Sequence, residues 1–164
     1  MYKDEILKLK KEKNAVILAH FYQNDEIQEV ADFVGDSLAL SKMAASTTAD
    51  IIVFCGVYFM AETAKILSPT KKVLLPKKNA TCQMARMVDY DELLQYKNNN
   101  PDTVIITYVN TRANIKALSD VIVTSSNAEK IVKNYKDKKI MYVPDKNLGT
   151  YLKHKLGYNI SVWP

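Results

Sequence analysis

The sequence predicts an α/β protein: repeated three-layer αβα domains with mainly parallel sheets, of which the chain carries two copies. Short, continuous apolar runs rich in β-branched residues alternate with segments of helical periodicity, a pattern typical of parallel strands buried on both faces. The run from Ala15 to Tyr22 also returns as residues 103–110, at a constant offset of 88 residues. The pattern repeats without a gap as far as Lys65 and Lys153, which predicts a duplication with domains at 1–86 and 87–164.

The individual strands and helices follow from this alternation. Strands are expected at 16–19, 51–55, 73–75, 104–107, 121–123 and 140–143, with a further one at 158–163. Helices are expected at 1–14, 61–67, 89–97, 127–135 and 146–156. One helical face is also indicated by Ile27, Val30, Ala31 and Val34, and is repeated by Ile115, Leu118 and Ile122. Ser126 with Glu129 fits a capping box, and Gly157 fits a helix stop.

Composition limits the class of protein. With 48% hydrophobic residues, 4 Gly and 5 Pro, the 164-residue chain can bury a sizeable core. The net charge of +5 is spread along the chain without a basic stripe interleaved with aromatic residues, which disfavours nucleic acid and favours small anionic metabolites. The sequence shows the apolar core of neither a signal peptide nor a membrane span, so we expect a cytoplasmic protein without a membrane partner.

Polar residues follow the first apolar run of each copy. His20 and Tyr22 come directly after the run 16–19, and Tyr108 and Asn110 come after 104–107. Because ligands of open α/β sheets bind beyond the carboxyl ends of the strands, these four residues predict one ligand site between the copies. Imidazole transfers protons near neutral pH, and phenol and amide groups bind carboxylate or phosphate oxygens. A lone histidine after a strand is more often a satisfied core residue, but the matching polar residues of the second copy favour a site.

Two serines and two cysteines are further candidates. Ser37 and Ser125 occupy the same position in both copies before a helical run, so each fits an N-cap, an anion-binding residue, or both. Cys82 is predicted to lie in a loop, where it is either a metal ligand or nucleophile, or an ordinary thiol. Cys55 ends an apolar run and is expected to be a buried hydrophobe. The sequence contains no CxxC, HExxH or GxGxxG motif.

Several long motifs, in order along the chain, resemble the quinolinate synthase family. They are Ala19-His20-Phe21-Tyr22-Gln23, Val34-Gly35-Asp36-Ser37-Leu38-Ala39-Leu40-Ser41, Phe54-Cys55-Gly56-Val57-Tyr58-Phe59-Met60-Ala61-Glu62-Thr63-Ala64-Lys65 and Tyr108-Val109-Asn110-Thr111. The resemblance implies three similar α/β domains around a pseudo-threefold axis, with the active site where they meet. The two copies found here would be two of those three.

The resemblance also implies a reaction and a set of site residues. Members of the family condense iminoaspartate with dihydroxyacetone phosphate to quinolinate, losing phosphate and water, with a [4Fe–4S] cluster as Lewis acid. By resemblance, His20 and Tyr22 are catalytic and Cys82 is the first of three cluster ligands. The residues that would contact the anionic substrates are His20, Ser37, Tyr108, Val109, Asn110 and Ser125, with Met60 close to the ligand.

This chain departs from the family pattern in length. The family's second cluster cysteine lies shortly beyond a Trp-Pro-Gly segment, and this sequence stops at Trp163-Pro164. We therefore interpret the chain as a fragment that lacks the third domain, and expect it to be free of the cluster, inactive by itself and prone to self-association. The alternative is a non-catalytic α/β module that binds a phosphorylated or dicarboxylic metabolite.

Overall fold

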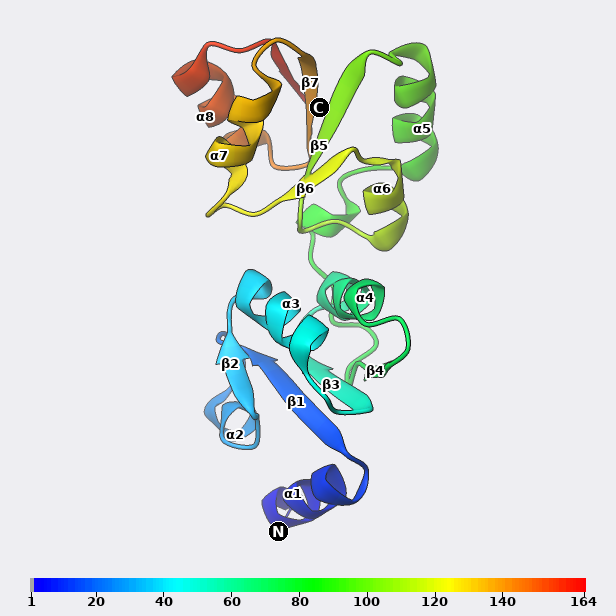
Figure 1. Ribbon diagram of the computed structural model, residues 1–164, viewed down its shortest axis with the longest axis vertical. Coiled ribbons are helices and arrows are strands. Elements are labelled where there is room, and N and C mark those ends of the chain that lie inside the picture. Colours follow the sequence, from blue (N-terminus) through cyan, green and yellow to red (C-terminus); the bar gives the residue numbers. More distant parts are fainter. Residues whose placement is uncertain (1) are drawn as a thin grey trace. The chain divides into compact units, whose positions relative to one another are not determined.

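The computed structural model describes residues 2–164, which form two compact units, one ending at Thr81 and one running from Cys82 to Pro164 (Figure 1). Each unit is a four-stranded parallel sheet with helices on both faces, which confirms the predicted fold class. The domain boundary after residue 86, drawn from the repeat, stays a prediction. No helix within residues 2–164 combines the length and the apolar character needed to span a membrane.

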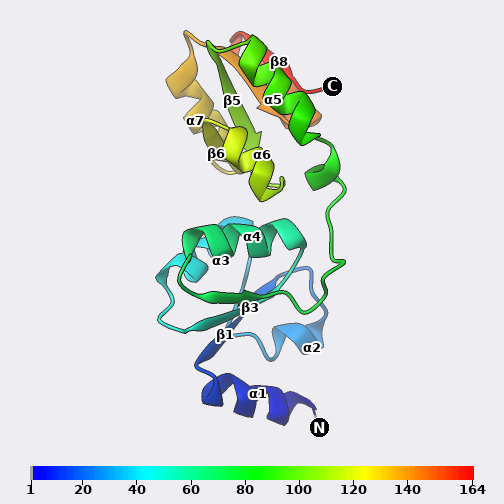
Figure 2. The same ribbon diagram turned by 90° about the vertical axis from the view of Figure 1, so that its right-hand side faces the viewer.

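The first unit has the sheet order β2-β1-β3-β4. Its elements are α1 (Tyr2–Glu12), β1 (Ala15–His20), α2 (Asp25–Gln28), β2 (Phe33–Gly35), α3 (Ser37–Ser46), β3 (Ile51–Cys55), α4 (Tyr58–Leu67) and β4 (Lys72–Leu74). Helices α3 and α4 cover one face of the sheet, and α1 and α2 lie on the other (Figure 2). The strand order reverses between β1 and β3, so the crevice at their carboxyl ends is where a ligand is expected in such a sheet.

The second unit repeats this arrangement with the order β6-β5-β7-β8. Its elements are the 3-10 turn Met84–Arg86, α5 (Tyr90–Asn99), β5 (Thr103–Tyr108), α6 (Ala113–Leu118), β6 (Val121–Val123), α7 (Ala128–Val132), the 3-10 turn Lys133–Tyr135, β7 (Lys139–Val143), α8 (Lys146–Leu156) and β8 (Ile160–Val162). Alternate strand residues enter two separate cores. Ile106 and Tyr142 pack toward α7 and α8, whereas Ile105 and Met141 pack toward α5 and α6.

The duplication is confirmed strand by strand. Every strand of the second unit begins and ends 88 residues after its counterpart, so that β5 follows β1, β6 follows β2, β7 follows β3 and β8 follows β4. The register repeats too: Ala19 pairs with Cys55 in one sheet, and Thr107 pairs with Val143 in the other. His20 and Tyr108 consequently end the equivalent inner strands of the two units.

An aspartate fastens the start of the second strand to the first strand in both copies. The backbone N–H of Ile17 donates to Asp32 Oδ2 at 2.8 Å, and the N–H of Asp32 donates to the Ile17 carbonyl at 2.9 Å. In the second unit the Ile105 N–H donates to Asp120 Oδ2 at 2.7 Å, and the Asp120 N–H donates to the Ile105 carbonyl at 3.0 Å. This paired hydrogen bond, here called the aspartate clamp, sets the register of the edge strand that precedes Ser37 or Ser125.

The predicted helical face at residues 27–34 is wrong. Helix α2 ends at Gln28, and Val34 lies in strand β2; likewise Ile122 lies in β6. The apolar residues at helical spacing span a short helix, a turn closed by the aspartate clamp, and an edge strand. The repeat itself predicts a strand here, because the offset of 88 residues maps the predicted strand 121–123 onto residues 33–35.

The helix starts also differ from the predictions. Asp36, rather than Ser37, caps α3, since its Oδ1 accepts the Ala39 N–H at 2.8 Å. Neither Ser125 nor Ser126 caps α7, whose first residue is Ala128 and whose N-cap position is Asn127. The capping box is therefore absent from this helix: the Ser126 hydroxyl lies 2.9 Å from the Thr124 hydroxyl instead. Helix α8 and its left-handed stop at Gly157 are as predicted.

Candidate functional site

The first unit presents His20 at the carboxyl end of β1. The imidazole is 6% exposed, and its Nδ1 accepts a long hydrogen bond of 3.4 Å from the Tyr22 backbone N–H. A neutral ring that accepts at Nδ1 carries its proton on Nε2, which makes Nε2 a donor. Burial lowers the pKa of His20, and the negative charge of Asp36 opposes part of that shift. His20 is thus held as a neutral donor near neutral pH.

Aromatic rings enclose this imidazole. The Tyr22 ring centroid lies 3.9 Å from that of His20 with the planes tilted by 35°, and the Phe21 centroid lies 4.4 Å away. Phe21 and Tyr22 are themselves 59% and 52% exposed. The arrangement leaves a phenolic group at the surface beside a buried imidazole, which suits proton exchange with a bound molecule.

The start of α3 lies next to His20 in the same unit. His20 pairs with Gly35 across the β1–β2 ladder, and the Phe21 N–H donates to the Gly35 carbonyl at 3.1 Å. Asp36 and Ser37 follow directly, and Ser37 is the half-buried first residue of the ten-residue helix α3. His20 and Ser37 are therefore neighbours at one sheet edge. Sequence reasoning missed Asp36, although an aspartate before a helical run is a typical N-cap signal.

The second unit presents Tyr108, Val109 and Asn110 at the matching edge. Tyr108 and Asn110 are half-buried, whereas Val109 is 8% exposed. The Val109 N–H donates to the Val123 carbonyl at 2.8 Å, and its carbonyl accepts from the Thr111 N–H at 2.8 Å. Both polar backbone groups of Val109 are consequently engaged within the unit. Ser125 lies exposed in the loop between β6 and α7, where its neighbour Thr124 donates its N–H to Asn127 Oδ1 at 2.7 Å.

The two cysteines differ in environment. Cys82 is a half-exposed thiol in the loop after β4, as predicted. Cys55 is half-buried at the end of β3 rather than fully buried, and burial raises the pKa of its thiol, so it stays protonated. Among residues 2–164 no three His, Cys, Asp or Glu side chains are grouped as metal ligands. Of these two thiols, Cys82 lies in a loop and Cys55 at the end of a strand. Met60 is buried on α4 at 6% exposure.

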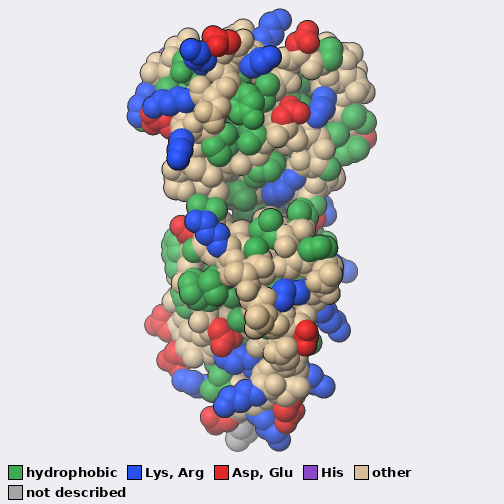
Figure 3. Space-filling model, in the orientation of Figure 1, with side chains coloured by type: hydrophobic (Ala, Val, Ile, Leu, Met, Phe, Trp, Pro, Cys, Tyr) green, Lys and Arg blue, Asp and Glu red, His purple; other side chains and the backbone are tan. Residues whose placement is uncertain are grey.

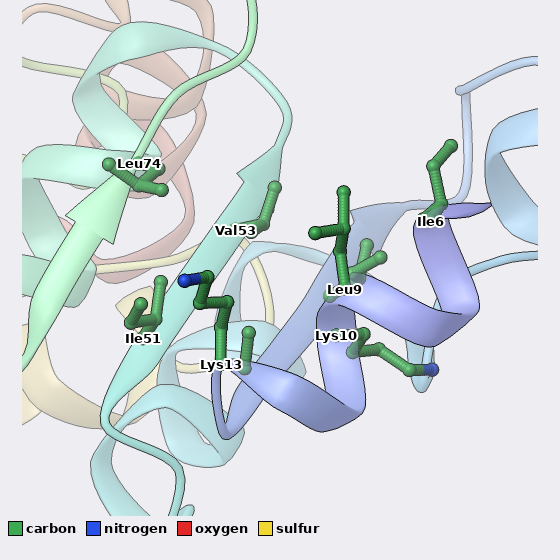
Figure 4. Close-up of a pocket in the computed structure, with 9 residues that line it drawn as sticks. Ile6, Leu9, Lys10, Lys13, Ile51, Val53 and Leu74 are labelled. Atoms are coloured by element: carbon green, nitrogen blue, oxygen red, sulfur yellow. The ribbon is translucent and has the colours of Figure 1, made fainter. Parts of the chain in front are cut away.

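Apolar grooves lie away from these residues. One of about 210 Å³ runs between α1 and the β3–β4 side of the first sheet, lined by apolar side chains such as Leu9, Val53 and Leu74 and by Lys10 and Lys13 (Figure 4). Helices α1 and α2 do not cover all four strands, so part of this face of the first sheet is exposed. On the face shown in Figure 3, basic and acidic side chains are scattered, without a continuous basic stripe. None of the predicted site residues lines the groove.

The fold defines a duplicated, parallel α/β protein in which polar residues end the equivalent inner strand of each copy. The family described as quinolinate synthetase A protein matches residues 4–164. The chain belongs to this family.

Curated relatives agree with this assignment. Quinolinate synthase of Sulfurihydrogenibium sp. is 58% identical over 149 residues, covering 91% of this chain and 48% of the relative. That of Ehrlichia chaffeensis is 54% identical, covering 98% and 51%, and that of Pyrobaculum aerophilum is 52% identical, covering 99% and 53%. The chain thus spans about half the length of these relatives.

One solved structure is distantly similar. It is the E-1-hydroxy-2-methyl-but-2-enyl-4-diphosphate reductase of Plasmodium falciparum, with a TM-score of 0.36 and 20% identity, covering 99% of this chain and 53% of that one.

Proposed function

We propose that this chain supplies two of the three similar domains of a quinolinate synthase, which condenses iminoaspartate with dihydroxyacetone phosphate and releases phosphate and water. The observation that carries the proposal is family membership over residues 4–164, combined with polar residues that follow the equivalent inner strand of each unit. Both proposed substrates are anions, and the groups at the two edges are donors.

In the first unit, His20 and Tyr22 would act on the reacting atoms. The Nε2–H of neutral His20 donates to a carbonyl or carboxylate oxygen, because Nδ1 is occupied by the Tyr22 N–H. The exposed phenol of Tyr22, stacked on the imidazole, is placed to give or take a proton at the same atom. Ser37 adds a hydroxyl at the start of α3, where the positive end of the helix dipole favours an anion.

In the second unit, Tyr108, Asn110 and Ser125 would bind the oxygens of a carboxylate or phosphate group. Phenol, amide and hydroxyl donate without carrying charge, so they hold an anion without forming an ion pair. The backbone N–H and carbonyl of Val109 are hydrogen-bonded within the unit, so Val109 would lie against the ligand without hydrogen-bonding to it. We propose that each edge binds part of the anionic substrates in the complete protein.

The family's cluster would add a Lewis acid. When bound, an iron with an open position polarises a carbonyl or hydroxyl oxygen of the substrate. Cys82 is the thiol that this chain would contribute, while Cys55, kept protonated by burial, would not. The remaining ligands would come from outside the described residues.

The test is a chimera that joins this chain to the second half of the Sulfurihydrogenibium relative, which is 58% identical over the shared part. After anaerobic reconstitution it should form quinolinate. His20→Ala should lower the rate by roughly 10²–10⁴-fold, as expected for loss of a proton-transfer group. Cys82→Ser should abolish the cluster, whereas Cys55→Ser is the matched control and should retain it. A chimera that holds iron and sulfide and binds both substrates, yet forms no quinolinate, would contradict the proposal.

The chain alone gives a second readout. We expect no stoichiometric iron or sulfide in it after the same reconstitution, because one thiol does not hold a cubane. A stable [4Fe–4S] centre in the isolated chain would show that the ligand set is wrong.

A further inference from the structure

The fully buried tyrosine of β7 carries a hydroxyl that nothing in the described part of the chain satisfies. Tyr142 is 0% exposed, and its hydroxyl oxygen has no hydrogen-bond partner among residues 2–164. A buried hydroxyl left unpaired costs a substantial part of the stability of a domain of this size. Such an atom requires an explanation, which a ligand would supply.

The internal repeat shows that the hydroxyl is not needed for packing. The offset of 88 residues aligns Tyr142 with Phe54, which holds the equivalent place in β3 and is 1% exposed. A phenyl ring without a hydroxyl therefore fills this position in the first unit. At this position the second unit carries one additional oxygen atom, whose burial without a partner is unfavourable.

Tyr142 lies close to the candidate edge of the second unit in the fold. Tyr142 pairs with Ile106 in the β5–β7 ladder, and Tyr108, two residues further toward the carboxyl end, packs against the same core. Burial raises the pKa of Tyr142, and the nearby charges of Asp145 and Tyr108 raise it further, so the hydroxyl stays a neutral donor. Gly149 of α8 admits the ring, because a Cβ there would lie 2.8 Å from Tyr142 Cδ1.

We propose that the Tyr142 hydroxyl is a ligand-binding group of the second unit, which donates a hydrogen bond to a carboxylate oxygen once the Tyr108 ring turns aside. A carboxylate is favoured over a phosphate dianion because Asp145 places a negative charge nearby. That charge is partly offset, since Asp145 Oδ1 accepts the Leu148 N–H at 2.9 Å at the start of the eleven-residue helix α8. The proposal rests on the proposed function only in taking the ligand to be an anion.

The experiment compares two reciprocal substitutions in the full chain. Tyr142→Phe removes the hydroxyl from the second unit, and Phe54→Tyr adds one to the first. Thermal unfolding gives the stability of each variant without ligand, and calorimetric titration with succinate gives its carboxylate affinity. Inorganic phosphate is titrated in parallel to separate the two kinds of anion.

Opposite changes in stability and affinity are the expected signature. Tyr142→Phe should raise the Tm of the second unit by about 4–8 °C, because an unpaired hydroxyl that costs about 1 kcal/mol or more is removed. The same variant should weaken succinate binding by about tenfold and leave phosphate binding unchanged, because a hydrogen bond to a charged oxygen is lost. Phe54→Tyr should lower the Tm and leave succinate affinity as it is.

Four results would overturn the proposal. A lower Tm for Tyr142→Phe would mean that the hydroxyl is satisfied within the chain. An unchanged succinate affinity would leave the hydroxyl without a ligand, and an effect on phosphate alone would exclude a carboxylate. Absence of succinate binding to the unsubstituted chain would also refute it. Quinolinate formation by the chimera is measured independently, so failure here and failure of the proposed function are distinguishable.

Discussion

Replacing Asp120 with alanine should destabilise the second unit by about 2 kcal/mol, because it opens the aspartate clamp. Its Oδ2 accepts the backbone N–H of Ile105, a residue that is 0% exposed, at 2.7 Å. Removing the acceptor leaves that buried N–H unpaired, which costs about 1–3 kcal/mol. The ion pair with Lys97, at 3.4 Å between half-exposed side chains, adds at most about 1 kcal/mol and screens with salt.

The assay uses the chain's single tryptophan. Trp163 is 7% exposed and lies edge-on to Tyr96 at 6.0 Å between ring centroids, so its fluorescence reports unfolding of the second unit. Asp120→Ala should lower the midpoint of that transition by about 8–16 °C, because a loss of 1 kcal/mol corresponds to about 4–8 °C in a unit of this size. Asp102→Ala, at an exposed aspartate directly before β5, is the matched control and should shift this midpoint by at most about 2–4 °C.

The equivalent substitution in the first unit checks the reasoning. Asp32 makes the same bond to Ile17 at 2.8 Å, so Asp32→Ala should cost a similar amount, read by circular dichroism. A loss below about 0.5 kcal/mol for both variants would mean that the N–H groups find another partner, and the clamp would then have no structural role.

Three further predictions concern single groups. Asp36→Asn keeps an N-cap but removes the charge that raises the pKa of His20, so the His20 pKa measured by NMR should fall further. In the unsubstituted chain the folded-state pKa of His20 already lies below its unfolded value. His20 therefore contributes stability that is present above pH 6.5 and is lost as the pH falls toward the folded pKa. An unchanged His20 titration would exclude the electrostatic contact. Gly149→Ala should destabilise the chain by about 1–3 kcal/mol, since its Cβ would lie 2.8 Å from a core ring; wild-type stability in chemical denaturation would refute that steric argument. Cys82 should react with iodoacetamide faster than Cys55, whose pKa is raised by burial, and equal rates would contradict this order.

Much of the fold could be predicted because the strands are buried on both faces. Such strands appear in the sequence as continuous apolar runs, and β3 was predicted with its observed bounds. Helix α8 was also predicted with its observed bounds, because its glycine stop is a local signal. The short elements were predicted least well. A three-residue strand such as β2 has exposed side chains and no apolar run of its own, so only comparison with β6 reveals it.

The candidate site was predictable in part for the same reason. His20 and Tyr108 stand out as polar residues at the end of apolar runs, and the repeat places them at equivalent edges. Asp36 and Tyr142 were not found. The charge of Asp36 acts on His20, which ends a neighbouring strand, and the role proposed for Tyr142 depends on its complete burial. Neither property can be read from the residues adjacent in the sequence.

The two copies differ at the residues that end their inner strands and agree at the aspartate clamp. The clamp residues Asp32 and Asp120 are identical and make the same bond to within 0.1 Å. At the carboxyl edges, by contrast, His20 corresponds to Tyr108. A duplicated scaffold with unlike edges is what recognition of two unlike ligands requires, since identical edges would bind the same group twice. The proposed reaction joins a dicarboxylate to a triose phosphate, and the asymmetry of the edges fits that pair. Exchanging the edge residues by His20→Tyr and Tyr108→His in the chimera should therefore abolish quinolinate formation while both units stay folded; retained turnover would mean that the difference between the copies has no catalytic role.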